Sequence, residues 1–185
     1  MDSAGHPLDC FAGRGFLPAW RTLNSDFPNY YLAASLHRRG VPLDRAYEWT
    51  WFQRQKDYLG IPQAPVAFTP HPPMCALPIL PLSVLSPLAA KRVWPLLNHG
   101  FLVLACELLH RVTKLHWRRV ALVSLLCVVP LRANFLLGQY YILILLLMCA
   151  AYYCSCLDHR LISGLFLAAG ASLKLFPALF LILFV

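Results

Sequence analysis

The residues best suited to chemistry in this sequence are a carboxylate and the aromatic side chain that follows it. Asp26 stands between Ser25 and Phe27, and Tyr30 follows it about one helical turn later. A carboxylate can act as a general base and accept the proton of an attacking hydroxyl group. Asp is also a preferred residue before the first turn of a helix, so Asp26 could instead cap a helix that begins near Pro28. The residue types alone leave both roles open.

Four further polar residues stand at positions where a ligand could bind. Lys174 interrupts an apolar segment, where a charge is costly unless it faces a cavity or an anion such as a lipid-linked phosphate. Alternatively, the helix breaks at Pro177 and Lys174 reaches out to the membrane surface. Arg132 and Gln139 could bind phosphate or sugar hydroxyls, or could simply anchor a turn between two helices. His71 could contact a substrate, although a solvated loop histidine is the simpler interpretation.

The composition indicates a membrane protein. Hydrophobic residues make up 59% of the chain and charged residues only 13%, about half of their usual share in soluble domains. The net charge of +8 could suggest nucleic acid as a partner, but residues 1–90 carry 7 Lys/Arg against 6 Asp/Glu. Residues 91–185 carry 9 against 2, and most of these basic residues lie between apolar runs. Such a distribution is typical of membrane topology and disfavours nucleic-acid binding.

Four apolar segments follow one another in the second half of the chain. Each is close to the ~20 residues that cross the hydrocarbon core of a membrane. We therefore predict an all-α, polytopic transmembrane protein with spans at residues 92–109, 119–137, 139–156 and 161–185. The basic loop at 110–119 and the weaker one at 158–160 should face the cytoplasm. This orientation places the turn at 132–138 and all of residues 1–90 outside.

Residues 1–90 are predicted to form a large extracytoplasmic loop with amphipathic and interfacial helices. Residues 28–39 have the pattern of a short amphipathic helix, and residues 44–58 mix aromatic and charged side chains that suit the headgroup layer. The prolines of residues 62–87 predict an extended chain up to Pro73 and a broken helix after it. Cys10 and Cys75 are a candidate disulfide pair if this segment lies outside the cell, and the sequence leaves their pairing open.

The predicted topology raises the question of how the first ninety residues are exported. Residues 1–27 contain no apolar region typical of a secretory signal. The chain also ends at Val185 inside an apolar run. We therefore expect one span before Met1 and several after Val185, so that this chain is a fragment of a longer protein.

Four stretches together resemble a known family of membrane enzymes. They are SDFPNYYLAASLHRRG, FTPHPPMCALPILPL, NFLLGQYYILILLL and LAAGASLKLFPALFLIL, and they fall within residues 24–185. Their order and spacing resemble the polyprenol-phosphate-mannose-dependent alpha-mannosyltransferases of family GT87, or DUF2029, in the GT-C superfamily. This resemblance implies a GT-C-like helical fold, a large first outer loop and an active site that faces away from the cytoplasm.

The resemblance also implies an activity and a role for one candidate residue. The activity is transfer of a hexose, with mannose expected, from a polyprenyl-phosphate donor to a lipid or glycan acceptor outside the plasma membrane. Asp26 would be the base. On their own chemistry, Lys174 and Arg132 are candidates to hold phosphate, and Gln139, His71 and Tyr30 are candidates to contact donor or acceptor. The alternative for Tyr30 is an aromatic residue of the membrane interface. We expect no cofactor and no metal, because Asp26 has no neighbouring carboxylates in the sequence. A transporter or flippase for lipid-linked sugars and an inactive fragment are the alternatives.

Overall fold

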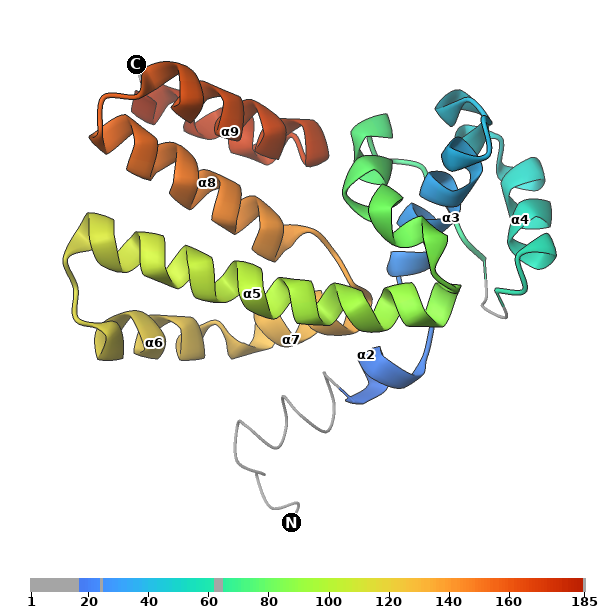
Figure 1. The fold of residues 1–185 in the computed structure, drawn as a ribbon, viewed down its shortest axis with the longest axis horizontal. Helices are drawn as coiled ribbons and strands as arrows, with labels where there is room; N and C mark the ends of the chain where they lie inside the picture. The colour runs from blue at the N-terminus through green and yellow to red at the C-terminus, as the bar shows by residue number, and fades with distance from the viewer. Residues whose placement is uncertain (1–16, 24, 62–64, 185) are drawn as a thin grey trace, which may run out of the picture. The chain divides into compact units, whose positions relative to one another are not determined.

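The computed structural model describes residues 17–23, 25–61 and 65–184, and within these ranges it contains helices and no strand (Figure 1). The all-α prediction is therefore confirmed for this part of the chain. The chain divides into two units. The first unit comprises the residues up to Pro95 together with Phe135–Gln139, and the second comprises Leu96–Asn134 and Tyr140–Val185. Cys10 lies outside the described residues, so its pairing with Cys75 stays an expectation.

The first unit is built around one buried helix. Its elements are α2 (Leu17–Arg21), α3 (Phe27–Arg38), the 3-10 helix η2 (Leu43–Tyr47), α4 (Trp49–Tyr58) and the 3-10 helix η3 (Pro73–Val84). Helix α3 begins and ends within one residue of the helix predicted at 28–39. Unlike a surface amphipathic helix, it is buried on nearly every side, because η3 and η2 pack against it. Tyr31 on α3 donates to the carbonyl of Leu85 at 2.6 Å, and Arg38 donates to the carbonyl of Ser83 at 2.8 Å.

The proline-rich segment forms the predicted extended chain followed by an irregular helix. Residues 65–68 have no regular structure, and η3 begins at Pro73. Pro78 and Pro81 lie inside η3, where each removes a backbone donor that an α-helix would need. Helix α4 is tied to the extended part, because the backbone N–H of Val66 donates to the side-chain oxygen of Gln53 at 3.2 Å. The predicted single segment at 44–58 is divided into η2 and α4.

The second unit contains most of the apolar helices. They are α5 (Pro87–Thr113, from Leu96 onward), α6 (Trp117–Leu126), α7 (Val128–Leu137, up to Asn134), α8 (Tyr141–Cys156), α9 (Arg160–Leu173) and the 3-10 helix η4 (Phe176–Phe184). Helices α8 and α9 pack side by side, and η4 contacts both (Figure 1). Gly170 lies at this contact, where a Cβ atom would be at ordinary contact distance from Pro177 (3.6 Å) and Leu147 (3.8 Å).

One described helix, α5, is long and apolar enough by itself to cross a membrane. Helices α6 and α7 would make a second span only as a broken pair, bent by 65° at the break. The apolar segment predicted at 161–185 is also divided, because α9 ends at Leu173 and η4 begins at Phe176. The prediction of four spans and of a long outer loop therefore remains a prediction.

Candidate functional site

Asp26 lies directly before α3, and its side chain does not cap that helix. The Asp26 backbone is helical (φ −77°, ψ −20°), and its carboxylate makes no capping hydrogen bond in the described structure. Instead, Oδ2 of Asp26 accepts a hydrogen bond from Nε2 of Gln139. Both side chains are half-buried, so the carboxylate is held in place and still meets solvent. Two residues that the sequence singled out separately are thus joined across 113 positions of the chain.

Lys91 completes this cluster, and the sequence analysis did not identify it. Its side chain is fully buried, with 0% exposed. The ammonium group donates to Oγ of Ser25 at 2.9 Å and to the carbonyl of Leu136 at 3.0 Å, and it interacts electrostatically with Asp26. The predicted span began at residue 92, so Lys91 lay just outside it. Because α5 in fact begins at Pro87, Lys91 is inside the helix.

Gly138 brings the backbone at the end of α7 against this cluster. Its φ of +71° lies in the left-handed region, which side chains with a Cβ disfavour. A Cβ atom at this position would lie 2.7 Å from Nζ of Lys91 and 2.8 Å from Cβ of Phe27. The backbone at Gly138 thus lies close to Lys91 and Phe27, and the neighbouring Gln139 donates its hydrogen bond to Asp26. We name Asp26, Gln139, Lys91, Ser25 and Gly138 the carboxylate cluster.

Tyr30 and His71 pack against each other elsewhere in the first unit. Tyr30 is fully buried, and its ring centroid lies 4.8 Å from that of His71. His71 lies half-buried in the loop before η3; its carbonyl accepts from Tyr47 Oη at 2.6 Å, and its backbone N–H donates to the carbonyl of Phe68 at 2.7 Å. Burial, with a smaller effect of Cys75, raises the pKa of Tyr47, which keeps this hydroxyl a donor. A contact of Tyr30 or His71 with a sugar remains a prediction, and for Tyr30 it requires the ring to become exposed.

Arg132 and Lys174 belong to the second unit. Arg132 lies half-buried on α7. Lys174 follows the last residue of α9, where the backbone is extended (φ −147°, ψ 136°), and its Nζ lies 5.2 Å from the ring centroid of Tyr141. The helix thus breaks at Lys174 rather than at Pro177, and the charge stands at a helix end instead of in the middle of a span. Binding of phosphate by either residue remains a prediction.

A pair of buried amides holds the helices of the second unit together. Nδ2 of Asn134 on α7 donates to Oδ1 of Asn98 on α5 at 3.3 Å. Oδ1 of Asn134 in turn accepts from the backbone N–H of Tyr141 at 3.1 Å, at the first residue of α8. Because buried amides are costly unless they are bonded, this arrangement fixes the short connection between α7 and α8. Asn134 is therefore a structural residue in the described unit.

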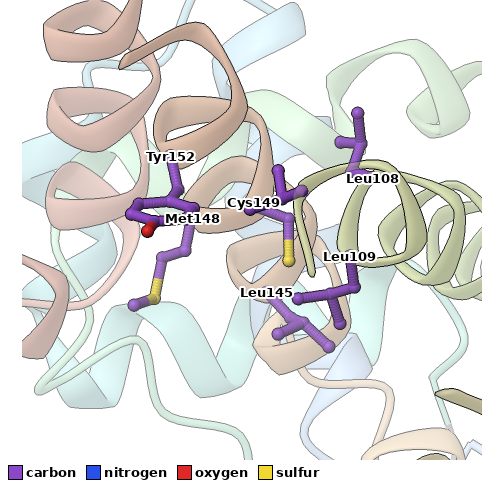
Figure 2. A pocket seen from close by; sticks show the side chains of 7 residues that line it. Leu108, Leu109, Leu145, Met148, Cys149 and Tyr152 are labelled. Atoms are coloured by element: carbon purple, nitrogen blue, oxygen red, sulfur yellow. The ribbon is translucent and has the colours of Figure 1, made fainter. Parts of the chain in front are cut away.

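An apolar cavity lies between α5 and α8 in the second unit (Figure 2). Its volume is about 190 Å³, and Figure 2 shows the side chains from the two helices that line it. It is lined by Leu108, Leu109, Val112, Leu145, Met148, Cys149 and Tyr152. Such a lining suits a hydrocarbon chain and offers few groups that could bind a sugar. Among the residues that the structure describes, no group of three or more His, Cys, Asp or Glu could hold a metal ion.

Comparison with protein families supplies the identity of the chain. Residues 68–185, well over half of the sequence, match glycosyltransferase family 87. No curated protein and no solved structure matches this chain significantly. The matched range includes His71, Arg132, Gln139 and Lys174 but begins after Asp26. The resemblance to family GT87 is confirmed. The chain therefore belongs to glycosyltransferase family 87, and its activity is that of a glycosyltransferase.

Proposed function

We propose that this glycosyltransferase moves a hexose, with mannose expected, from a polyprenyl-phosphate donor to a hydroxyl group of a lipid or glycan acceptor. The reaction takes place on the outer side of the plasma membrane, in a multi-pass protein. The observation that supports this proposal best is the Asp26 carboxylate, which is half-exposed, makes no capping bond and is held by Gln139. A carboxylate fixed in this way suits a general base.

In the proposed reaction one bond to the anomeric carbon forms, another breaks, and one proton moves to the protein. The acceptor oxygen attacks the anomeric carbon of the hexose while its proton passes to the Asp26 carboxylate. The bond between the anomeric carbon and the phosphate oxygen breaks, and the electron pair leaves with polyprenyl phosphate. Gln139 holds Oδ2 of Asp26, which leaves Oδ1 to receive the proton. The resemblance to family GT87 supports the polyprenyl donor, and the apolar character of the chain supports a lipid-linked substrate.

The experiment that tests this function uses membranes that contain the full-length protein. Label should pass from polyprenyl-phosphate mannose to an extracted lipid or glycan, and polyprenyl-phosphate glucose should be a poorer donor. Soluble nucleotide sugars should give no transfer when their conversion to polyprenyl-phosphate sugars is blocked. Equal transfer from mannose and glucose donors would contradict the proposed sugar, and transfer from a nucleotide sugar alone would contradict the proposed donor class.

The orientation of the first unit gives a separate prediction. In a variant whose native cysteines are replaced, a cysteine at the exposed Asp57 should react with a membrane-impermeant maleimide added to intact cells. A cysteine at His116, in the basic loop between α5 and α6, should react only after permeabilisation. Labelling with the opposite pattern would place Asp26 in the cytoplasm, where an outer-leaflet donor could not reach it.

Lys174 is proposed to bind the donor phosphate, with Arg132. Replacing Lys174 with methionine removes a hydrogen bond to a charged group, which contributes about 1.5–3 kcal/mol. The KM for the polyprenyl-phosphate donor should therefore rise roughly 10- to 100-fold, with a smaller change in kcat. The matched control is Lys114→Met, because Lys114 is exposed in the loop after α5. An unchanged donor KM in Lys174→Met would exclude Lys174 from phosphate binding.

A further inference from the structure

The ammonium group of Lys91 is buried at a place where a charge would otherwise be unfavourable. A fully buried lysine loses its hydration, and this cost is offset only if protein groups replace the water. Three groups do so here. Ser25 Oγ lies at 2.9 Å, the carbonyl of Leu136 at 3.0 Å, and the ring centroid of Phe27 at 5.5 Å. The sequence thus places the amine of Lys91 in the interior of the first unit, where two oxygen atoms accept its hydrogen bonds and an aromatic ring lies close to it.

These three contacts are made with residues that are close in sequence to Asp26 or to Gln139, the two partners of the hydrogen bond. Ser25 and Phe27 are the residues directly before and after Asp26. Leu136 lies three residues before Gln139, in the last turn of α7. Lys91 therefore holds both segments from which the Asp26–Gln139 bond is made. The backbone of Gly138 also comes close to the Lys91 ammonium group, because a Cβ atom there would lie 2.7 Å from Nζ.

We propose that Lys91 is a positioning residue that fixes the Asp26 carboxylate and Gln139 in the orientation needed to accept the acceptor proton. This inference rests on the proposed function of Asp26 as the base. Lys91 does not touch a substrate in this arrangement, because its side chain is fully buried. It acts through Ser25, Leu136 and its electrostatic interaction with Asp26.

The test replaces Lys91 with methionine, which has a similar length but lacks the charge and the donors. We expect kcat for transfer from polyprenyl-phosphate mannose to fall roughly 10- to 100-fold, because small misplacements of a catalytic group have effects of this size. The KM for the donor should stay within about twofold, since Lys91 makes no contact in the binding step. Protein content of the membranes and thermal stability are measured beside the rates.

A double-mutant cycle with Asp26→Asn separates positioning from general stability. If Lys91 acts through the carboxylate, Lys91→Met should change kcat by less than about threefold when Asp26 is already asparagine. A wild-type kcat in Lys91→Met would overturn the inference, as would an equal loss of kcat in both backgrounds. If Lys91→Met fails to accumulate, Ser25→Ala decides, because it removes one acceptor of Lys91 and keeps the charge. A lower kcat with unchanged KM then supports positioning, and an unchanged kcat overturns it.

The same experiment distinguishes failure of this inference from failure of the proposed function. Absence of transfer by the wild-type protein, or full activity of Asp26→Asn, removes the proposed base and the positioning role with it. Loss of activity in Asp26→Asn together with full activity in Lys91→Met leaves the base in place and removes only Lys91.

Discussion

Replacement of Asp26 with asparagine should lower kcat for hexose transfer by roughly 10²- to 10⁴-fold, the range that general-base catalysis contributes. An amide cannot accept the acceptor proton, although it has nearly the same shape as the carboxylate. The asparagine oxygen can still accept the hydrogen bond from Nε2 of Gln139. The helix after it should also be unaffected, because the Asp26 side chain does not cap α3. The loss should therefore appear in kcat, with the protein still folded.

The matched control for this variant is Asp57→Asn. Asp57 belongs to the same unit, at the end of α4, and its side chain is 70% exposed in an ion pair with Lys56. Exposed ion pairs of this kind contribute little to stability, so Asp57→Asn should transfer label at the wild-type rate. The decisive measurement is the rate of label transfer at saturating donor, divided by the amount of folded protein. Wild-type turnover by Asp26→Asn would mean that another group takes the proton.

The sequence predicted the elements whose ends carry their own signals. The helix predicted at 28–39 matches α3 within one residue at each end; Pro28 is a residue that favours a helix start, and Gly40, with a positive φ of +84°, is one that favours a stop. Two apolar segments were predicted as single spans and are divided instead. The break between α6 and α7 occurs inside a run of apolar residues, where hydropathy does not change, whereas the break at Lys174 coincides with a charged residue shortly before Pro177. A count of apolar residues therefore locates a segment without showing its bends.

The carboxylate cluster was predictable only in part. Asp26 and Gln139 were singled out from their residue types and positions, and the family resemblance then implied the role of Asp26 as the base. Lys91 was missed because it lies near the end of an apolar segment, where a lysine normally reaches the membrane surface. What buries it is the convergence of α5 with residues distant in sequence, Ser25 and Leu136. The contact between the rings of Tyr30 and His71 likewise joins residues distant in sequence, which no local pattern predicts.

The second large effect expected is a loss of stability on replacing Gly138 with alanine. The left-handed backbone at Gly138 costs about 1–2 kcal/mol for a residue with a Cβ. The new Cβ would also lie 2.8 Å from Cβ of Phe27, which is fixed on the buried face of α3, and overpacking of this kind adds about 1–3 kcal/mol. The free energy of unfolding should therefore fall by roughly 2–5 kcal/mol.

Gly60→Ala isolates the packing part of this effect. Gly60 has a similar φ of +64°, but a Cβ atom there would meet nothing within 4 Å. It should therefore show only the backbone cost of about 1–2 kcal/mol. Unfolding of the first unit can be followed by the reaction of a thiol dye with the buried Cys75, kept as the single cysteine. Equal destabilisation by the two variants would mean that Phe27 and Lys91 move aside without cost. A larger loss for Gly138→Ala would support a tightly packed backbone beside the proposed base.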